Sequence, residues 1–310
     1  MTVVNLLVWA GILLFFIGAL SKIIRFARMP MHLRWELYPV PKEKAKASYG
    51  GSFLEEANWW TKEIHESKLT ELKAMSEEIL LLKGVHEANR PMWYWSWPLH
   101  FGLYLLVATI GLLLVGAIVE IVTGTALAAG APFWLFVHHL TKVVCWAGLI
   151  LAAVGSLGLL SMRLTSPKLT GFTSPFSILN LLFMFLLFGI GICSRLNGDA
   201  DAALLRAAVA GILTLKAPAA ALSWQMMAEL IGFAFFVAYL PVTFMSHMYM
   251  KFFTYHMVRW DDHPRRPGEP TDERLLEYLT WNVGWSASHV TKNGKHKTWA
   301  DVVMDQEVDK

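Results

Sequence analysis

Charged residues are scarce in this chain. Asp, Glu, Lys and Arg make up 16% of its 310 residues, whereas 55% of the residues are hydrophobic. The mean hydropathy is +0.43. A soluble domain needs a larger charged surface than this, so the composition indicates an integral membrane protein.

Cysteine is nearly absent as well. The two cysteines, Cys145 and Cys193, both lie in apolar runs and have no CxxC partner. This excludes the usual iron–sulfur and zinc frameworks, so we interpret both as packing residues. The formal net charge is only +3 and reflects the loops, which implies no nucleic-acid partner.

Runs almost free of charge predict five membrane-spanning helices. Each is at least as long as the ~20 residues that cross the hydrocarbon core. The expected spans are 1–21, 93–122, 133–161, 174–195 and 219–250. The first run has no basic start and no Ala-x-Ala-like exit, so we expect a retained anchor. The predicted fold class is an all-α integral membrane protein, a five-transmembrane-helix bundle.

The basic residues predict the orientation of this bundle. Twelve of the 27 lie in the segment 22–92 and nine in 251–310, whereas the connection 120–132 has none and 196–218 has few. Basic loops stay on the cytoplasmic side. We therefore expect an outer N-terminus, a long cytoplasmic loop at 22–92, an outer loop at 196–218 and a cytoplasmic tail at 251–310.

The cytoplasmic loop contains an amphipathic pattern between residues 53 and 86. Apolar side chains recur there at steps of three and four residues, namely Leu69, Leu72, Met75, Ile79 and Leu82. This spacing predicts a helix with one apolar side. The apolar side of this helix could pack against the membrane surface, the tail of the same chain or a cytoplasmic subunit.

Two of the eleven histidines fall inside apolar spans at matching depth. His100 lies in the first turns of the second span, and His247 lies about one turn before Lys251, where the fifth span leaves the membrane. Imidazoles kept in an apolar span commonly serve a site, which favours ligation of one haem by both. The alternative is that neighbours such as Ser246, Tyr249 or tryptophans satisfy each imidazole separately.

A second polar group is expected in the outer half of the membrane. It comprises His138, His139 and Lys142 on the third span, Glu229 on the fifth and Glu120 at the outer end of the second. A quinone head group needs such donors and a base. Alternatively, His138 and Lys142 reach water with Glu229 as their counter-ion. A second haem held by His139, or by Met226 or Met227, is a third reading.

The pattern of spans and histidines resembles the membrane cytochrome b family of the nitrate reductase gamma subunit. The local match is Arg163-Leu164-Thr165-Ser166-Pro167-Lys168, together with Pro241 six positions before His247. The resemblance implies haem b at His100 and His247. The family's outer haem ligands would fall at Ile110 and Glu229, and neither residue is a histidine. We therefore expect that the outer haem is absent or bound by another ligand, for which His139 is the first candidate.

The long loop, with Arg34-Trp35-Glu36-Leu37-Tyr38-Pro39, is more similar to the cytochrome b subunits of the Dsr, Hmc and Tmc redox complexes of sulfate reducers. That resemblance implies a bacterial inner-membrane subunit of a quinone-linked oxidoreductase complex. It would exchange electrons between menaquinone and a cytoplasmic iron–sulfur subunit similar to heterodisulfide reductase. A periplasmic multihaem cytochrome c is a further implied partner, besides membrane lipids. The alternative function is a haem-free membrane anchor.

Overall fold

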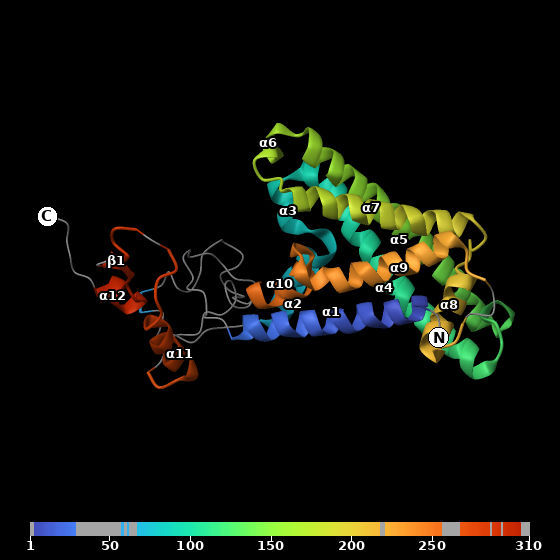
Figure 1. The fold of residues 1–310 in the computed structure, drawn as a ribbon, viewed down its shortest axis with the longest axis horizontal. Helices are drawn as coiled ribbons and strands as arrows, with labels where there is room; N and C mark the ends of the chain where they lie inside the picture. The colour runs from blue at the N-terminus through green and yellow to red at the C-terminus, as the bar shows by residue number, and fades with distance from the viewer. Residues whose placement is uncertain are drawn as a thin grey trace. The chain divides into compact units, whose positions relative to one another are not determined.

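The computed structural model describes residues 3–28, 57–58, 61, 67–217, 221–255, 267–285, 287–292 and 294–304 (Figure 1). The chain divides into two compact units. The first unit comprises residues 1–21 and 72–246, and the second comprises 22–71 and 247–310.

Five of the described helices are long and apolar enough to cross a membrane. They are α1 (Val3–Ala27), α4 (Arg90–Thr123), α5 (Pro132–Thr165), α7 (Pro175–Leu196) and the segment Trp224–Val242, which comprises α9 (Trp224–Tyr239) and the 3₁₀ turn that follows it. The expectation of a mostly helical chain with five apolar helices is confirmed at this level. The chain is thus compatible with a multi-pass membrane protein.

Local sequence signals set the ends of these helices. Pro132 and Pro175 begin α5 and α7, because a proline at the first helical position loses no hydrogen bond. Ser223 precedes α9, and its hydroxyl accepts the N–H of Met226 at 3.2 Å. Gly124 ends α4 with φ 65°, a left-handed conformation that costs glycine little.

A seam of glycines brings α4 and α5 into close contact. A Cβ placed at Gly155 would lie 2.4 Å from the backbone nitrogen of Leu99, and one at Gly102 would lie 2.5 Å from that of Ala152. Residue numbers rise along α4 while they fall along α5, so the two helices are antiparallel. Small side chains permit such close backbone approach between apolar helices.

The remaining long helices extend this arrangement. Leu187 of α7 packs against Gly232 of α9, and the hydroxyl of Tyr239 donates to Asn180 Oδ1 at 2.8 Å, so α7 and α9 are antiparallel. Gly11 of α1 meets the backbone of Ala234, and α1 runs beside α9 (Figure 1). The antiparallel pairs bring the end of α7 and the start of α9 to the same end of the bundle.

A short apolar helix, α8 (Ala203–Thr214), covers that end of the bundle. The sequence predicted only an outer loop over 196–218. The amide of Asn5, at the start of α1, donates to the carbonyls of Gly211 and Lys216 at 3.1 and 3.0 Å. A buried apolar cluster joins α1, α4, α8 and α9: Val8, Leu113, Ala202, Leu205, Ala208, Ile212, Met226, Leu230 and Ala234.

The fifth expected span is interrupted. It was predicted to run continuously over 219–250, but α9 ends at Tyr239 and is followed by 3₁₀ turns at Leu240–Val242 and Phe244–Ser246. The regular helix resumes as α10 (His247–Tyr255). Pro241 lies in the first of these turns and has no N–H to donate to the preceding turn. Glu229 and His247 therefore do not share a face of one continuous helix.

The amphipathic segment also differs from its prediction. It forms two helices, α2 (Lys68–Leu81) and α3 (Lys83–Ala88), and residues 53–56, 59–60 and 62–66 lie outside the described part. Leu82 stands between the helices with φ 51°, so the chain reverses there instead of continuing the helix. The short elements Leu127–Ala129 (a 3₁₀ turn) and α6 (Pro167–Thr170) connect the long helices.

The second unit contains a small folded piece near the C-terminus. It is built from α11 (Pro270–Leu279), the antiparallel strands β1 (Thr291–Lys292) and β2 (Lys295–His296), and α12 (Trp299–Met304). Val283 and Val290 are buried in it, and the rings of Trp285 and Trp299 meet edge to face. The tail is therefore partly structured.

The glycine seam generates a stability prediction. Gly155→Ala places a methyl group against the backbone of Leu99, which forces α4 and α5 apart and should cost about 1–3 kcal/mol. The measurement is the thermal unfolding midpoint of the purified protein in detergent. Gly111→Ala in α4 is the matched control, because nothing lies within 4 Å of its added Cβ. An unfolding midpoint for Gly155→Ala at or above that of Gly111→Ala would contradict the close approach.

Candidate functional site

His100 has a tautomer that the geometry determines. Its Nδ1 lies 2.7 Å from the backbone oxygen of Ser96, one turn earlier in α4, and 3.4 Å from the Ser96 hydroxyl. A carbonyl oxygen only accepts, so Nδ1 carries the proton and donates it. In the neutral ring, Nε2 is then the nitrogen with the lone pair, the form in which histidine binds a metal.

An aromatic row lies beside His100 on α4. Trp97 and Phe101 stack with ring centroids 5.0 Å apart, and Trp93 lies 6.0 Å from Trp97. His86 packs edge to face on Trp93. At about 100° per residue, this row and His100 lie on a different side of α4 from Leu99 and Gly102, which face α5. His100 is half-buried there.

His247 is the first residue of α10 and is exposed. It belongs to the second unit, whereas His100 belongs to the first, so a shared haem stays a prediction. Ser246, one of the neighbours that the sequence offered to satisfy His247, donates its hydroxyl to the carbonyl of Thr243 at 2.8 Å.

The outer candidates take part in two ion-pair networks at the α8 end of the bundle. In the first, Arg195 NH2 donates to Glu229 Oε2 at 2.8 Å and to the Ser194 hydroxyl at 3.0 Å, while NH1 lies 3.0 Å from Asp199 Oδ2. The side chain of Arg195 is 0% exposed. The expected counter-ion role of Glu229 toward His138 and Lys142 is wrong, because Arg195 is the cation that it pairs with.

Asp199 links this network to the start of α8. Its carboxylate accepts the N–H groups of Leu204 and Leu205 at 2.7 and 3.2 Å. Burial raises the pKa of the Asp199 carboxyl, and this outweighs the lowering by the Arg195 guanidinium and the two N–H groups. The carboxylate thus serves both the buried arginine and the helix N-terminus.

The second network surrounds His138. Arg206 Nε donates to Glu120 Oε1 at 2.9 Å, and Arg206 NH2 donates to His138 Nδ1 at 3.3 Å. Since a guanidinium only donates, His138 Nδ1 must accept, and its Nε2–H faces Asp201 Oδ2 at 3.4 Å. Both ring nitrogens of His138 therefore contact protein groups, and binding iron or a quinone would require one of them to exchange its partner.

His139 and Lys142 are placed differently from His138. Both side chains are exposed on α5, although the ring centroids of His138 and His139 are only 5.3 Å apart. The four outer candidates therefore divide into two pairs. His138 and Glu229 belong to the internal ion pairs, while His139 and Lys142 are accessible from outside the bundle.

Sequence reasoning missed the two arginines that organise this end of the bundle. Arg195 is the last residue of the expected fourth span and Arg206 one of the few basic residues of the expected outer loop, yet both are at most 2% exposed. The spacing of Arg195 and Asp199, four residues apart at the end of a span, was the signal that could have identified the first network.

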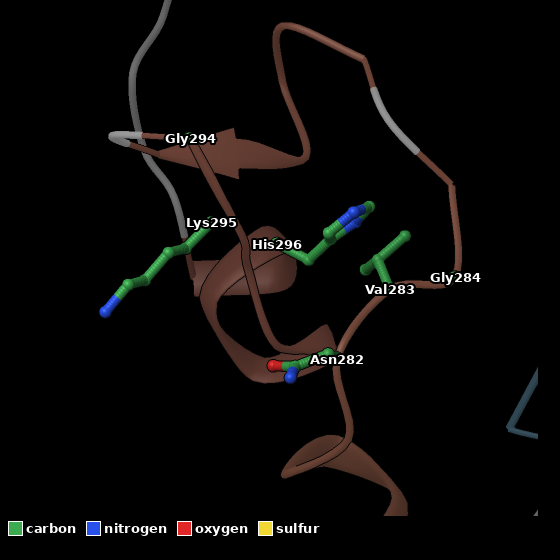
Figure 2. Close-up of a pocket in the computed structure, with 6 residues that line it drawn as sticks. All are labelled: Asn282, Val283, Gly284, Gly294, Lys295 and His296. Atoms are coloured by element: carbon green, nitrogen blue, oxygen red, sulfur yellow. The ribbon is translucent and has the colours of Figure 1, made fainter.

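A shallow pocket lies in the second unit, away from these residues in the sequence. Its lining residues are Asn282, Val283, Gly284, Gly294, Lys295 and His296. Figure 2 shows the His296 ring directed toward Val283 and the Lys295 side chain directed away from it. The pocket has no carboxylate and a single imidazole, so it offers no cluster of catalytic groups. Within the described ranges, no group of three or more His, Cys, Asp or Glu residues is arranged to hold a metal ion.

No family model, curated protein or solved structure matches this chain. The resemblance to the gamma subunit of nitrate reductase therefore rests on the sequence pattern alone. Any function has to be argued from the residues of the two candidate sites.

The first ion-pair network generates a prediction. Arg195→Met leaves the Glu229 and Asp199 carboxylates buried without their counter-ion, which should cost about 3–5 kcal/mol of stability. Thermal unfolding in detergent, followed by tryptophan fluorescence, measures this effect.

Arg163→Met provides the comparison for this variant. Arg163 makes only long hydrogen bonds, 3.3 Å to Phe172 O and 3.5 Å to the Thr173 hydroxyl, so its loss should cost less than about 1 kcal/mol. Equal unfolding midpoints for the two variants would show that Arg195 has no such role.

Proposed function

We propose that this chain is a membrane cytochrome b subunit of a respiratory complex. It exchanges electrons between the quinone pool, with menaquinone as the expected quinone, and a cytoplasmic iron–sulfur subunit. In this proposal the chain crosses a bacterial inner membrane five times, with its N-terminus outside and its C-terminus in the cytoplasm. It is a redox subunit of a quinone-linked oxidoreductase complex.

The observation that carries the proposal is the hydrogen bond between His100 Nδ1 and Ser96 O at 2.7 Å. It keeps the proton of the neutral ring on Nδ1, so the lone pair is on Nε2. Metal-bound histidines are commonly oriented by such a hydrogen bond from the other ring nitrogen. His100 thus fits the role of an axial haem ligand, and His247 is the proposed second ligand. A bound haem b would supply one-electron transfer at this position.

The outer half of the bundle does not fit a second haem of the family type. Ile110 has no ligating atom, and Glu229 is paired with Arg195 at 2.8 Å. His138 has both ring nitrogens engaged. We therefore propose one haem per chain, with His139 as the remaining candidate if a second is bound.

The accessible pair on α5 suits a quinone head group. His139 and Lys142 are three residues apart, so they lie on neighbouring positions of one helix face, and both are exposed. A quinone reaches a protein from the hydrocarbon, so a donor and a base on the outer surface of the bundle are accessible to it. We propose that Lys142 donates to a quinone oxygen and that His139 exchanges the proton.

The second candidate function is a haem-free membrane anchor. It is favoured by the outer ion pairs, since His138 and Glu229 already have partners within the chain, as residues with a structural role do. In that case the chain would hold a cytoplasmic iron–sulfur subunit, and a periplasmic multihaem cytochrome c, without carrying electrons itself.

The two functions predict different optical spectra. For the cytochrome, the purified protein should give a b-type band in the reduced-minus-oxidised spectrum, and a pyridine haemochrome assay should give one haem per chain. His100→Ala and His247→Ala should each remove the band, because a bis-histidine haem loses an axial ligand in either variant.

The exposed His289 provides the matched control, and His289→Ala should retain the full band. Loss of the band in the control as well would mean that the histidine assignment is wrong. If the unsubstituted protein has no band at all, the anchor function replaces the proposal.

The quinone proposal has its own test. Lys142→Ala and His139→Ala should slow haem reduction by a menaquinol analogue at least about tenfold, the lower end of what proton transfer by a side chain contributes. Haem content should not change. Val143→Ala serves as control, because Val143 is 63% exposed on the same helix and carries no polar group. Unchanged rates in both polar variants would place the quinone elsewhere.

A further inference from the structure

The C-terminal end of α2 is attached to α4 by an unusual set of hydrogen bonds. Three donors from one side of α4 reach three successive carbonyl oxygens in the last turn of α2. The pairs are Trp93 Nε1 with Leu81 O (2.7 Å), Trp97 Nε1 with Leu80 O (3.0 Å) and Tyr104 OH with Ile79 O (2.8 Å). These carbonyls have no partner inside the helix and point along its axis. The end of α2 therefore meets the flank of α4, and its axis leads away from α4 at a large angle.

The position along α4 places this junction near a membrane surface. α4 has 34 residues, or about 51 Å, which exceeds a hydrocarbon core of ~30 Å. If the core ends just before the charged Glu120, it begins about 20 residues earlier, close to His100. Trp93 and Trp97 then lie in the headgroup layer, where tryptophan is enriched, and Tyr104 lies just inside the core.

One side of α2 is apolar and exposed. Leu72, Ile79 and Leu80 are 61%, 42% and 53% exposed. At about 100° per residue, they fall within about 100° around the helix. Ser76 lies among them. Its hydroxyl donates to the carbonyl of Leu72 at 2.8 Å, so its O–H group is already hydrogen-bonded within the helix.

The acidic side of α2 is occupied within the chain. Glu77 Oε2 accepts Lys83 Nζ at 2.9 Å, and Glu78 Oε2 accepts the backbone N–H of Gly84, also at 2.9 Å. The reversal at Leu82 brings the start of α3 back to these carboxylates. Lys73 lies at the border between the two sides, with its side chain 77% exposed and its ammonium 4.0 Å from Glu77 Oε1.

We propose that α2 lies in the plane of the membrane surface and binds the phospholipid bilayer there. Leu72, Ile79 and Leu80 enter the boundary between head groups and acyl chains, while the ion pair of Lys73 and Glu77 stays at the level of the head groups. A helix with an exposed apolar side and charged residues beside it has this mode of binding. The hydrogen bonds from α4 hold the end of α2 at the depth that the mode requires. This inference does not depend on the proposed redox function.

Spin-label accessibility in lipid nanodiscs tests the proposal on the full chain. Cys193, which is exposed, is first replaced by serine, whereas Cys145 is buried. Single labels are then introduced by Leu72→Cys and Leu80→Cys on the apolar side, and by Ala74→Cys on the opposite side as the matched control. We expect labels at 72 and 80 to be relaxed more by oxygen, which concentrates in the bilayer, than by a water-soluble nickel chelate. The label at 74 should show the reverse.

Two results would overturn the proposal. Equal access of the nickel chelate to all three labels would place α2 in water. Labels at 72 and 80 that neither reagent reaches would show that this side packs on protein, either a further subunit or the tail of the same chain. Neither result bears on the b-type spectrum, so this inference and the redox proposal fail separately.

Discussion

A guanidinium inside an apolar bundle is stable only beside carboxylates, and this requirement organises one whole end of the protein. Arg195 joins the end of α7 to the start of α9 through Glu229, and Arg206 joins α8 to the end of α4 through Glu120. Because the long helices alternate in direction, charges far apart in the sequence meet at this end. Asp199 completes the arrangement by accepting the first N–H groups of α8. The carboxylates that neutralise the buried arginines thus also hold α8 in place.

The five apolar helices could be predicted because a run of about 20 uncharged residues has few other uses. What the pattern could not predict were features that depend on partners in space. Glu229 faces Arg195 and not Lys142, which no spacing within one helix reveals. α8 was missed because 12 residues are too few for a span. The interruption after Tyr239 has its cause in Pro241, which the sequence shows. The span was predicted from the mean hydropathy of a run of residues, and a single proline changes that mean little.

The candidate site likewise has features that the sequence predicts and features that depend on neighbours in space. The position of His100 within an apolar helix could be read from the apolar run, whereas its tautomer depends on the Ser96 carbonyl and required coordinates. Among the outer candidates, four residues of similar chemistry proved to have different environments. His138 and Glu229 stabilise the bundle, while His139 and Lys142 are accessible. Burial, which separates structural from reactive side chains, is a property of the fold and not of the residue type.

The glycine seam between α4 and α5 also restricts where a cofactor can be bound. The backbones of Gly155 and Leu99 approach so closely that not even a methyl group fits between them. A planar macrocycle cannot enter that interface, and α4 cannot rotate about its axis without losing it. The side of α4 that carries His100 and the tryptophan row faces away from this interface and contacts the end of α2. The absence of side chains at a few positions thus determines which side of this helix faces its neighbour α5.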